Sequence, residues 1–300
     1  MGDAGSLVPL RRSVIFYFAM KTFATLTLIG RDKSGVIAAV TQFLFDCQAN
    51  IEALEEQVSR GQFSMTLQAS WPSKGFQEKP VREGLARLAA RLSMELKVHF
   101  APQRTLQRMA LFVTREPHVL RSVLQAAQAG KIKAQPALIL GNRHDLKPVA
   151  AEHGIPFRHV DFNERAAAER KTLQILEEQQ IDFIVLARFM KILSPNFVWR
   201  WKNKIINIHP SLLPAFPGAS AYRQAYEKGV KIVGVTAHFV TPDLDQGPII
   251  WQEAFQTKPE ESLESIVRRG QAGESKCLVK AIRIFLEKRL DVHWGRVYGV

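Results

Sequence analysis

Between residues 108 and 210, short apolar runs alternate with longer segments that have helical periodicity. A strand that is apolar on both faces and alternates with helices is typical of a parallel sheet covered by helices on both sides. We therefore predict a Rossmann-like, mostly parallel, doubly wound α/β domain over residues 108–300. Two further strands, at 233–240 and 248–255, follow without a long helix between them. The apolar runs are MALFVT at 109–114, QPALILG at 135–141, DFIVLARF at 182–189 and KIINI at 204–208.

Residues 21–100 have a different pattern, in which alternating strands and two helical segments follow the order βαββαβ. This order predicts a separate ferredoxin-like domain ahead of the larger one. Residues 101–107 are polar and contain a proline, so we predict a linker there. We interpret residues 1–20 as a disordered extension. The predicted strands are 21–30, 50–58, 61–71 and 94–100, and the predicted helices are 36–48 and 80–93.

The chain is strongly basic, since 41 Lys and Arg minus 28 Asp and Glu gives a net charge of +13. The basic residues are dispersed and are not interleaved with aromatic side chains, which argues against a nucleic-acid partner. We predict no membrane span and no metal site, because neither a long apolar run nor metal-ligand spacing occurs. Two distant cysteines, Cys47 and Cys277, favour a chain without disulfides in the cytoplasm.

The most informative polar residues come at the ends of two predicted strands. Asn207 and His209 end the strand 204–208, and a period of two places both side chains on one face. Pro210 favours an extended backbone at His209, which preserves that arrangement. Asp245 follows the strand 233–240. An amide, an imidazole and a carboxylate could perform acyl transfer, although these residues could equally cap loops and turns.

Three stretches resemble the folate-dependent formyltransferase family: NIHPSLLPAFPG at 207–218, GVTAHFV at 234–240 and LDQGPII at 244–250. The resemblance implies that Asn207, His209 and Asp245 are catalytic, and that ARFMKILS at 187–194 binds the folate through backbone groups. A structural role for His238, in the core or behind the site, is the alternative to substrate binding. The folate-binding residues implied are Phe189, Met190, Lys191, Ile192, Leu193, His238 and Asp243.

Residues 21–100 resemble the ACT domain, a regulatory module that often binds amino acids at its first strand-to-helix turn. The resemblance implies an effector, glycine or methionine by analogy, and assembly into a homo-oligomer, either a dimer or a tetramer. Alternatively, Gly35 only caps a helix. The effector-binding residues implied are Asp32, Ser34, Gly35 and Val36.

The segment VTREPHVL at 113–120 decides between the branches of the family. Glycinamide ribonucleotide formyltransferases have a glycine-rich phosphate-binding turn there, whereas this segment has no glycine and contains Glu116. An ACT domain ahead of the formyltransferase fold is similar to the formyltetrahydrofolate deformylases. That resemblance implies hydrolysis of 10-formyltetrahydrofolate to tetrahydrofolate and formate, without a cofactor. The formate would supply purine synthesis, and the reaction would balance the one-carbon folate pools.

Two alternatives remain open from the sequence. The first is a 10-formyltetrahydrofolate-dependent transferase acting on an amine, glycinamide ribonucleotide or another acceptor. The second is a folate- or amino-acid-sensing regulator that keeps the fold without the activity.

Overall fold

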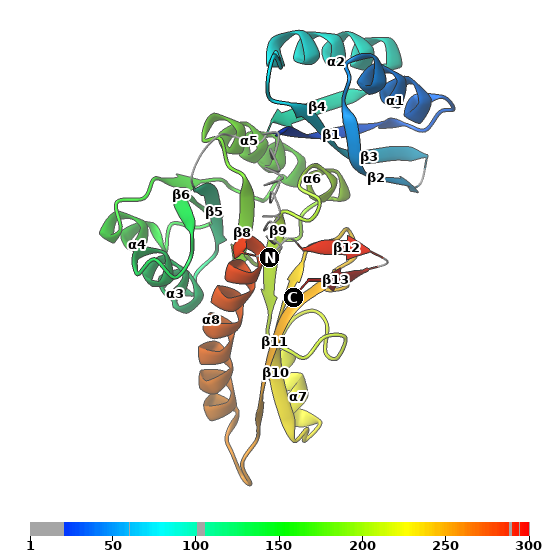
Figure 1. Cartoon of the computed structure of the whole chain (residues 1–300). Coiled ribbons are helices and arrows are strands. Elements are labelled where there is room, and N and C mark those ends of the chain that lie inside the picture. The colour runs from blue at the N-terminus through cyan, green and yellow to red at the C-terminus, as the bar shows by residue number, and fades with distance from the viewer. Residues whose placement is uncertain (1–20, 60, 101–105, 288–289, 294, 300) are drawn as a thin grey trace, which may run out of the picture. The chain divides into compact units, whose positions relative to one another are not determined.

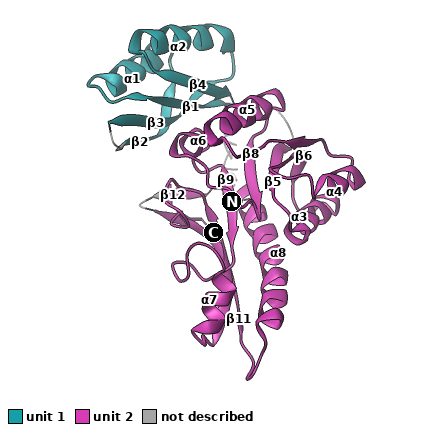
Figure 2. Cartoon of the chain, turned by 180° about the vertical axis from the view of Figure 1, so that it is seen from behind, with its two compact units in different colours: residues 1–102 teal, residues 103–300 magenta. Residues whose placement is uncertain are grey.

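A computed structural model of the chain describes residues 21–59, 61–100, 106–287, 290–293 and 295–299. The chain forms two compact units, residues 1–102 and 103–300 (Figure 2). The predicted extension, residues 1–20, and most of the predicted linker lie outside the described residues. Among the described residues, no helix combines the length and the apolar character needed to cross a membrane.

The smaller unit has the predicted βαββαβ order, and its antiparallel sheet has the strand order β2-β3-β1-β4. One face of the sheet packs on both helices through an apolar core that contains Leu26, Leu67 and Leu85, each at most 1% exposed. The second helix begins two residues earlier than predicted, because a proline is tolerated in the first turn. The elements are β1 (Lys21–Arg31), α1 (Val36–Asp46), β2 (Asn50–Ser59), β3 (Gln62–Pro72), α2 (Glu78–Leu92) and β4 (Glu95–Phe100).

The larger unit is built on a seven-stranded sheet of order β11-β10-β9-β8-β5-β6-β7 (Figure 1). The five strands from β9 to β7 in that order are parallel, and β10 pairs in antiparallel fashion with both β9 and β11, which confirms the predicted, mostly parallel α/β sheet. The strands are β5 (Gln107–Val113), β6 (Ala134–Gly141), β7 (Phe157–His159), β8 (Phe183–Ala187), β9 (Ile205–His209), β10 (Ile232–Phe239) and β11 (Ile249–Gln256).

Helices cover both faces of this sheet, as its apolar strands require. Helices α3, α4 and α8 contribute to the core on one face, and α5 and α6 contribute to the core on the other. All five residues of β8 are buried between these layers. The helices are α3 (Pro117–Gln128), α4 (Lys147–Glu152), α5 (Arg165–Glu178), α6 (Pro195–Arg200), α7 (Ala221–Glu227) and α8 (Leu263–Glu287).

A small hairpin follows α8 and has no counterpart among the predicted elements. Its strands, β12 (Asp291–His293) and β13 (Arg296–Tyr298), pair in antiparallel fashion. Each strand has three residues, which is too short for an alternating pattern to be recognised in the sequence.

Candidate active site

Asn207 and His238 face each other across two neighbouring strands, because the antiparallel register of β9 and β10 pairs these two residues directly. The amide nitrogen Nδ2 of Asn207 lies 3.2 Å from Nε2 of His238. On the other side of the ring, Nδ1–H of His238 donates to the carbonyl oxygen of Phe239 at 2.9 Å. In this tautomer Nε2 carries a lone pair, so it accepts the hydrogen bond from Asn207.

Burial favours the neutral form of the His238 imidazole. His238 is 2% exposed. The loss of solvation lowers the pKa of its imidazole, against the opposing effects of the Phe239 carbonyl and Asp245. A neutral His238 therefore holds one N–H of Asn207 and leaves the second N–H free to point elsewhere.

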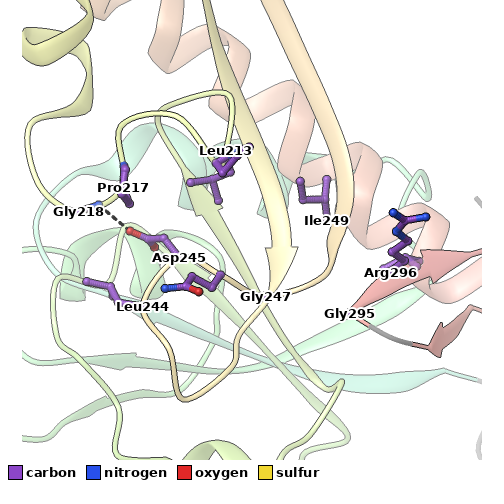
Figure 3. Close-up of a pocket in the computed structure, with 12 residues that line it drawn as sticks. Leu213, Pro217, Gly218, Leu244, Asp245, Gly247, Ile249, Gly295 and Arg296 are labelled. Atoms are coloured by element: carbon purple, nitrogen blue, oxygen red, sulfur yellow. Dashed lines mark hydrogen bonds between the residues drawn. The ribbon is translucent and has the colours of Figure 1, made fainter.

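Asp245 lies beside both histidines in the loop between β10 and β11. Its backbone has a φ of 55°, a left-handed conformation that aspartate tolerates better than most residues. Carboxylate oxygen Oδ2 accepts a hydrogen bond from the backbone N–H of Gly218 at 2.8 Å (Figure 3) and lies 3.3 Å from Nδ1 of His209. Oxygen Oδ1 lies 4.0 Å from Nε2 of His238, and no hydrogen bond joins it to any of the described residues.

His209 is enclosed by oxygen atoms on both sides of its ring. Nε2 lies 2.9 Å from the carbonyl oxygen of Phe216, and Nδ1 faces the Asp245 carboxylate. A neutral imidazole has one N–H donor, whereas an imidazolium can donate to both acceptors. His209 therefore has a hydrogen-bond acceptor beside each ring nitrogen, one of them the Asp245 carboxylate.

The proline-containing loop 210–218 is attached to the sheet by a short network of hydrogen bonds. The hydroxyl of Thr236 donates to the carbonyl of Ser211 at 2.7 Å and accepts from the backbone N–H of Leu213 at 3.0 Å. The Ser211 hydroxyl donates to the carbonyl of Ala215, so this serine stabilises the loop. The peptide bond between Leu213 and Pro214 is cis.

Gly247 allows the chain just before β11 to approach the end of β10 closely. A Cβ atom at this position would lie 1.6 Å from the carbonyl oxygen of Phe239, the oxygen that accepts the His238 proton. No side chain fits at that distance, so a glycine is required here.

A cavity of about 500 Å³ brings together the residues singled out in the sequence. Asn207, His209 and Asp245 contribute to its wall, as do His238 and Asp243. The segment Phe189–Leu193 forms another part of the wall; Met190 and Ile192 are 59% exposed, whereas Phe189 and Leu193 are anchored in the core. Size and lining suit a ligand with a flat, partly apolar ring system.

A second cavity, of about 930 Å³, lies behind the proline-containing loop. It is lined by Pro217, Gly218 and Asp245 on one side and by Arg296 of β13 on the other (Figure 3). Asp245 and Gly218 line both cavities. The carboxylate therefore lies in the wall between the two.

Two family descriptions match the chain, formyl transferase over residues 107–282 and ACT domain over residues 22–99. A formyltetrahydrofolate deformylase from Bacillus subtilis is 36% identical over 269 residues, which are 87% of this chain and 88% of the relative. The chain belongs to the formyltetrahydrofolate deformylase family. The resemblance found in the motifs is therefore confirmed for both units.

Solved structures of deformylases and of transformylases match different shares of this chain. A formyltetrahydrofolate deformylase from Pseudomonas syringae is 31% identical, with a TM-score of 0.63, and the match covers 95% of this chain and 96% of that one. A glycinamide ribonucleotide transformylase from Symbiobacterium toebii is 34% identical, with a TM-score of 0.62, but covers 67% of this chain. About a third of this deformylase-family chain thus has no counterpart in the transformylase.

The predicted effector residues lie in the smaller unit, at the exposed turn between β1 and α1. Gly35 is the N-cap of α1 with a φ of 83°, so the capping role is present. Asp32 and Ser34 are exposed, and Val36 is buried in the core of this unit. Binding of an amino acid at this turn stays a prediction for this member of the deformylase family.

The sequence analysis of this deformylase-family chain did not connect five residues that lie together near the cavity. All five are titratable groups joined by hydrogen bonds or ion pairs, and two of the five line the cavity. Only Glu116 drew attention in the sequence, because it replaces a glycine-rich turn. The others lie on separate elements, so no local motif connects them. They are Glu116, His118, Arg188, Tyr222 and Glu274.

Proposed function

We propose that this protein hydrolyses 10-formyltetrahydrofolate to tetrahydrofolate and formate. The observation that carries the proposal is the meeting of Asn207, His209 and Asp245 on one cavity wall, in a chain that matches deformylases across both units. In the reaction, a water oxygen attacks the formyl carbon and the bond from that carbon to N10 breaks. N10 takes up a proton, and formate leaves.

Asp245 and His209 are placed to prepare the water. Oδ2 of Asp245 is held by Gly218 and His209, whereas Oδ1 has no hydrogen-bond donor among the described residues. Oδ1 is therefore the oxygen that accepts a hydrogen bond from the water and orients it toward the carbonyl. Because Asp245 and His209 are in contact, the proton taken from water is shared by the pair.

Asn207 supplies the oxyanion donor. One N–H of its amide is bound to His238, so the other can donate to the formyl oxygen as negative charge develops on it. His209 passes a proton toward N10. Since both of its ring nitrogens face protein oxygens, this transfer requires the contact with Phe216 or with Asp245 to open.

The folate ring is expected in the cavity against Phe189–Leu193 and Asp243. The backbone groups of residues 191–193 form no hydrogen bond within the described part of the chain, so they are available to the polar edge of a pterin. The polar groups of a flat ring can be recognised in this way without charged side chains, which makes lysine acceptable at position 191.

Formate release from 10-formyltetrahydrofolate alone tests the function. The purified protein is incubated with the substrate and no amine, and formate and tetrahydrofolate are measured over time. Equal amounts of the two products are expected. If the formyl group leaves only after an amine is added, the protein is a transferase; if it never leaves, the protein is a regulator that has kept the fold.

Three further properties belong to the proposal. Glycine or methionine acts as an effector at residues 31–36, the chain is a homo-oligomer, and the enzyme works in the cytoplasm, where its formate supplies purine synthesis. The ACT domain match supports the first two, and two free cysteines suit the third. Equilibrium dialysis with each amino acid at millimolar concentration, followed by light scattering of the intact chain, tests the effector and the assembly. A monomer that binds neither amino acid would contradict both.

A further inference from the structure

A cluster of charged residues occupies the point where the strand order of the large sheet reverses. From β5 the chain adds β6 and β7 on one side, and then returns to add β8 and β9 on the other. In open α/β sheets, the crevice at the carboxyl ends of two such strands is the usual ligand-binding position. Here the crevice between β5 and β8 contains what we call the switch-point cluster: Glu116, His118, Arg188, Tyr222 and Glu274.

Arg188 joins the two carboxylates of the switch-point cluster. Its Nη2 donates to Oε1 of Glu116 at 3.2 Å, and its Nε lies 3.6 Å from Oε2 of Glu274. His118 repeats the bridge: its Nε2 lies 3.1 Å from Oε2 of Glu274, and its Nδ1 lies 3.7 Å from Oε2 of Glu116. The Tyr222 hydroxyl donates to the remaining oxygen of Glu274 at 2.8 Å.

Glu274 is the buried centre of the cluster. Its side chain is 1% exposed and lies in the middle of α8. A buried carboxylate is tolerated only when donors surround it, and this one faces an arginine, a histidine and a tyrosine. The neighbouring carboxylate raises the pKa of the Tyr222 hydroxyl further after burial has raised it, so Tyr222 remains a donor.

Two backbone features make room for the switch-point cluster. Gly270 lies one turn before Glu274, and a Cβ atom there would lie 2.3 Å from Cζ of Tyr222. A glycine inside a helix is less favourable than an alanine. Arg188 has a φ of 62°, a left-handed conformation that is unfavourable for a residue with a side chain. Both unfavourable features serve the same contacts, which indicates that the cluster has a purpose beyond stability.

The cluster closes one end of the reaction cavity. Arg188 and Tyr222 line that cavity together with Asn207 and His209, and Glu274 lies behind them. Glu116 is the N-cap of α3, where the helix would otherwise offer its free N–H groups to an anion. An acceptor that carries a phosphate would therefore meet a carboxylate at this helix terminus.

We propose that the switch-point cluster determines which acceptor takes the formyl group, by excluding amines and leaving water. This inference rests on the proposed hydrolysis. With water, the broken N10–C bond yields formate. With an amine, the nitrogen would attack the same carbon, N10 would take up the amine proton, and an N-formyl amine would form. Arg188 and Glu116 are the residues whose removal opens the crevice.

The test uses a charge-neutral double variant, Arg188→Gly with Glu116→Ser. Glycine accepts the left-handed backbone at position 188, and the variant removes one positive and one negative charge together. Arg121→Ala is the matched control, because Arg121 pairs with a glutamate as Arg188 does, but at the surface and outside both cavities. Each protein receives 10-formyltetrahydrofolate with and without glycinamide ribonucleotide, and formate and formylated amine are quantified by mass spectrometry.

The wild-type chain and Arg121→Ala are expected to release formate only, with no inhibition by the amine at millimolar concentration. The double variant is expected to raise the ratio of formylated amine to formate at least about tenfold, or to be competitively inhibited by the amine as it enters the opened crevice. A double variant that releases formate without inhibition and without a change in this ratio would overturn the proposal, as would an equal change in Arg121→Ala.

Two controls separate this outcome from other failures. A wild-type chain that releases no formate refutes the proposed hydrolysis and says nothing against an exclusion role. If the double variant loses its thermal transition, Glu116→Ser and Tyr222→Phe are assayed separately with the same two readouts. Both single variants keep most of the cluster. If the amine inhibits neither of them, the result counts against the proposal.

Discussion

His238 offers the sharpest test of how this site is organised, because it is expected to act through Asn207 and not on the substrate. The perturbation is His238→Phe, which keeps a ring in the core but removes both ring nitrogens. Asn207 then loses the acceptor at 3.2 Å, and the Phe239 carbonyl loses the donor at 2.9 Å. The Asn207 amide can rotate away from the formyl oxygen.

The expected magnitude follows from the hydrogen bonds involved. Losing Asn207 itself removes an oxyanion donor worth about 2.7–4 kcal/mol of transition-state stabilisation. Losing its orientation removes a neutral buried hydrogen bond, worth about 0.5–1.5 kcal/mol. We therefore expect kcat for formate release to fall about tenfold, which corresponds to about 1.4 kcal/mol, with KM for the folate nearly unchanged.

A double-mutant cycle with Asn207→Ala distinguishes positioning from independent action. If His238 acts through Asn207, the double variant is about as slow as Asn207→Ala alone, and the coupling energy has the magnitude of the His238→Phe effect, about 1.4 kcal/mol. His238→Gln should recover part of the rate, because its amide oxygen can accept from Asn207. Additive losses in the cycle would refute the reasoning and assign His238 a direct role toward Asp245 or the water.

Four further outcomes are expected. Asn207→Ala should lower kcat about 100-fold or more in the formate assay, and a rate near that of the wild type would remove it from the mechanism. Gly247→Ala should lower the free energy of unfolding in urea by about 3 kcal/mol or more, because the new Cβ has no space. The comparison is Gly229→Ala, where φ is 61° and no atom lies within 4 Å of the new Cβ; it should lower the free energy of unfolding by about 1–2 kcal/mol. If the two substitutions lowered the free energy of unfolding equally, the crowding at Gly247 would be relieved by movement of the backbone. Burial raises the pKa of the Cys277 thiol to about 12, so a thiol reagent at pH 8 should modify it only after unfolding, and rapid labelling of the native chain would contradict its burial. Because burial lowers the pKa of folded His238 below 6.5, its contribution to stability is complete above that pH and is lost as the pH falls through the folded value. The wild type should thus lose more stability than His238→Phe between pH 7 and pH 5 in urea titrations.

Much of the fold follows from local pattern. The apolar runs of β5, β6, β8 and β9 predict a buried parallel sheet, and the alternation around them predicts the covering helices. The βαββαβ order of residues 21–100 is predicted from the sequence in the same way. The hairpin of β12 and β13 is not predicted, because three-residue strands carry too little periodicity. Helices α6 and α7 are too short for two full repeats of a helical pattern.

The candidate site divides in the same way. Asn207 and His209 are two residues apart on one strand, so the sequence places them on one face by itself. The distance between Asp245 and His209, in contrast, depends on the backbone turn at Asp245 and on the close approach that Gly247 permits. His238 pairs with Asn207 only through the register of an antiparallel strand pair that no local motif encodes.

The sequence by itself determines the two units, the parallel sheet and the strand end that carries the amide and the imidazole, because periods of two and of 3.6 residues are local properties of the chain. Only the tertiary structure determines that His238 lies within hydrogen-bond distance of Asn207, and that Arg188, which follows β8, meets residues of α3, α7 and α8 in the switch-point cluster. Their contacts join residues up to 156 positions apart, and such contacts are created by the packing of helices on the sheet.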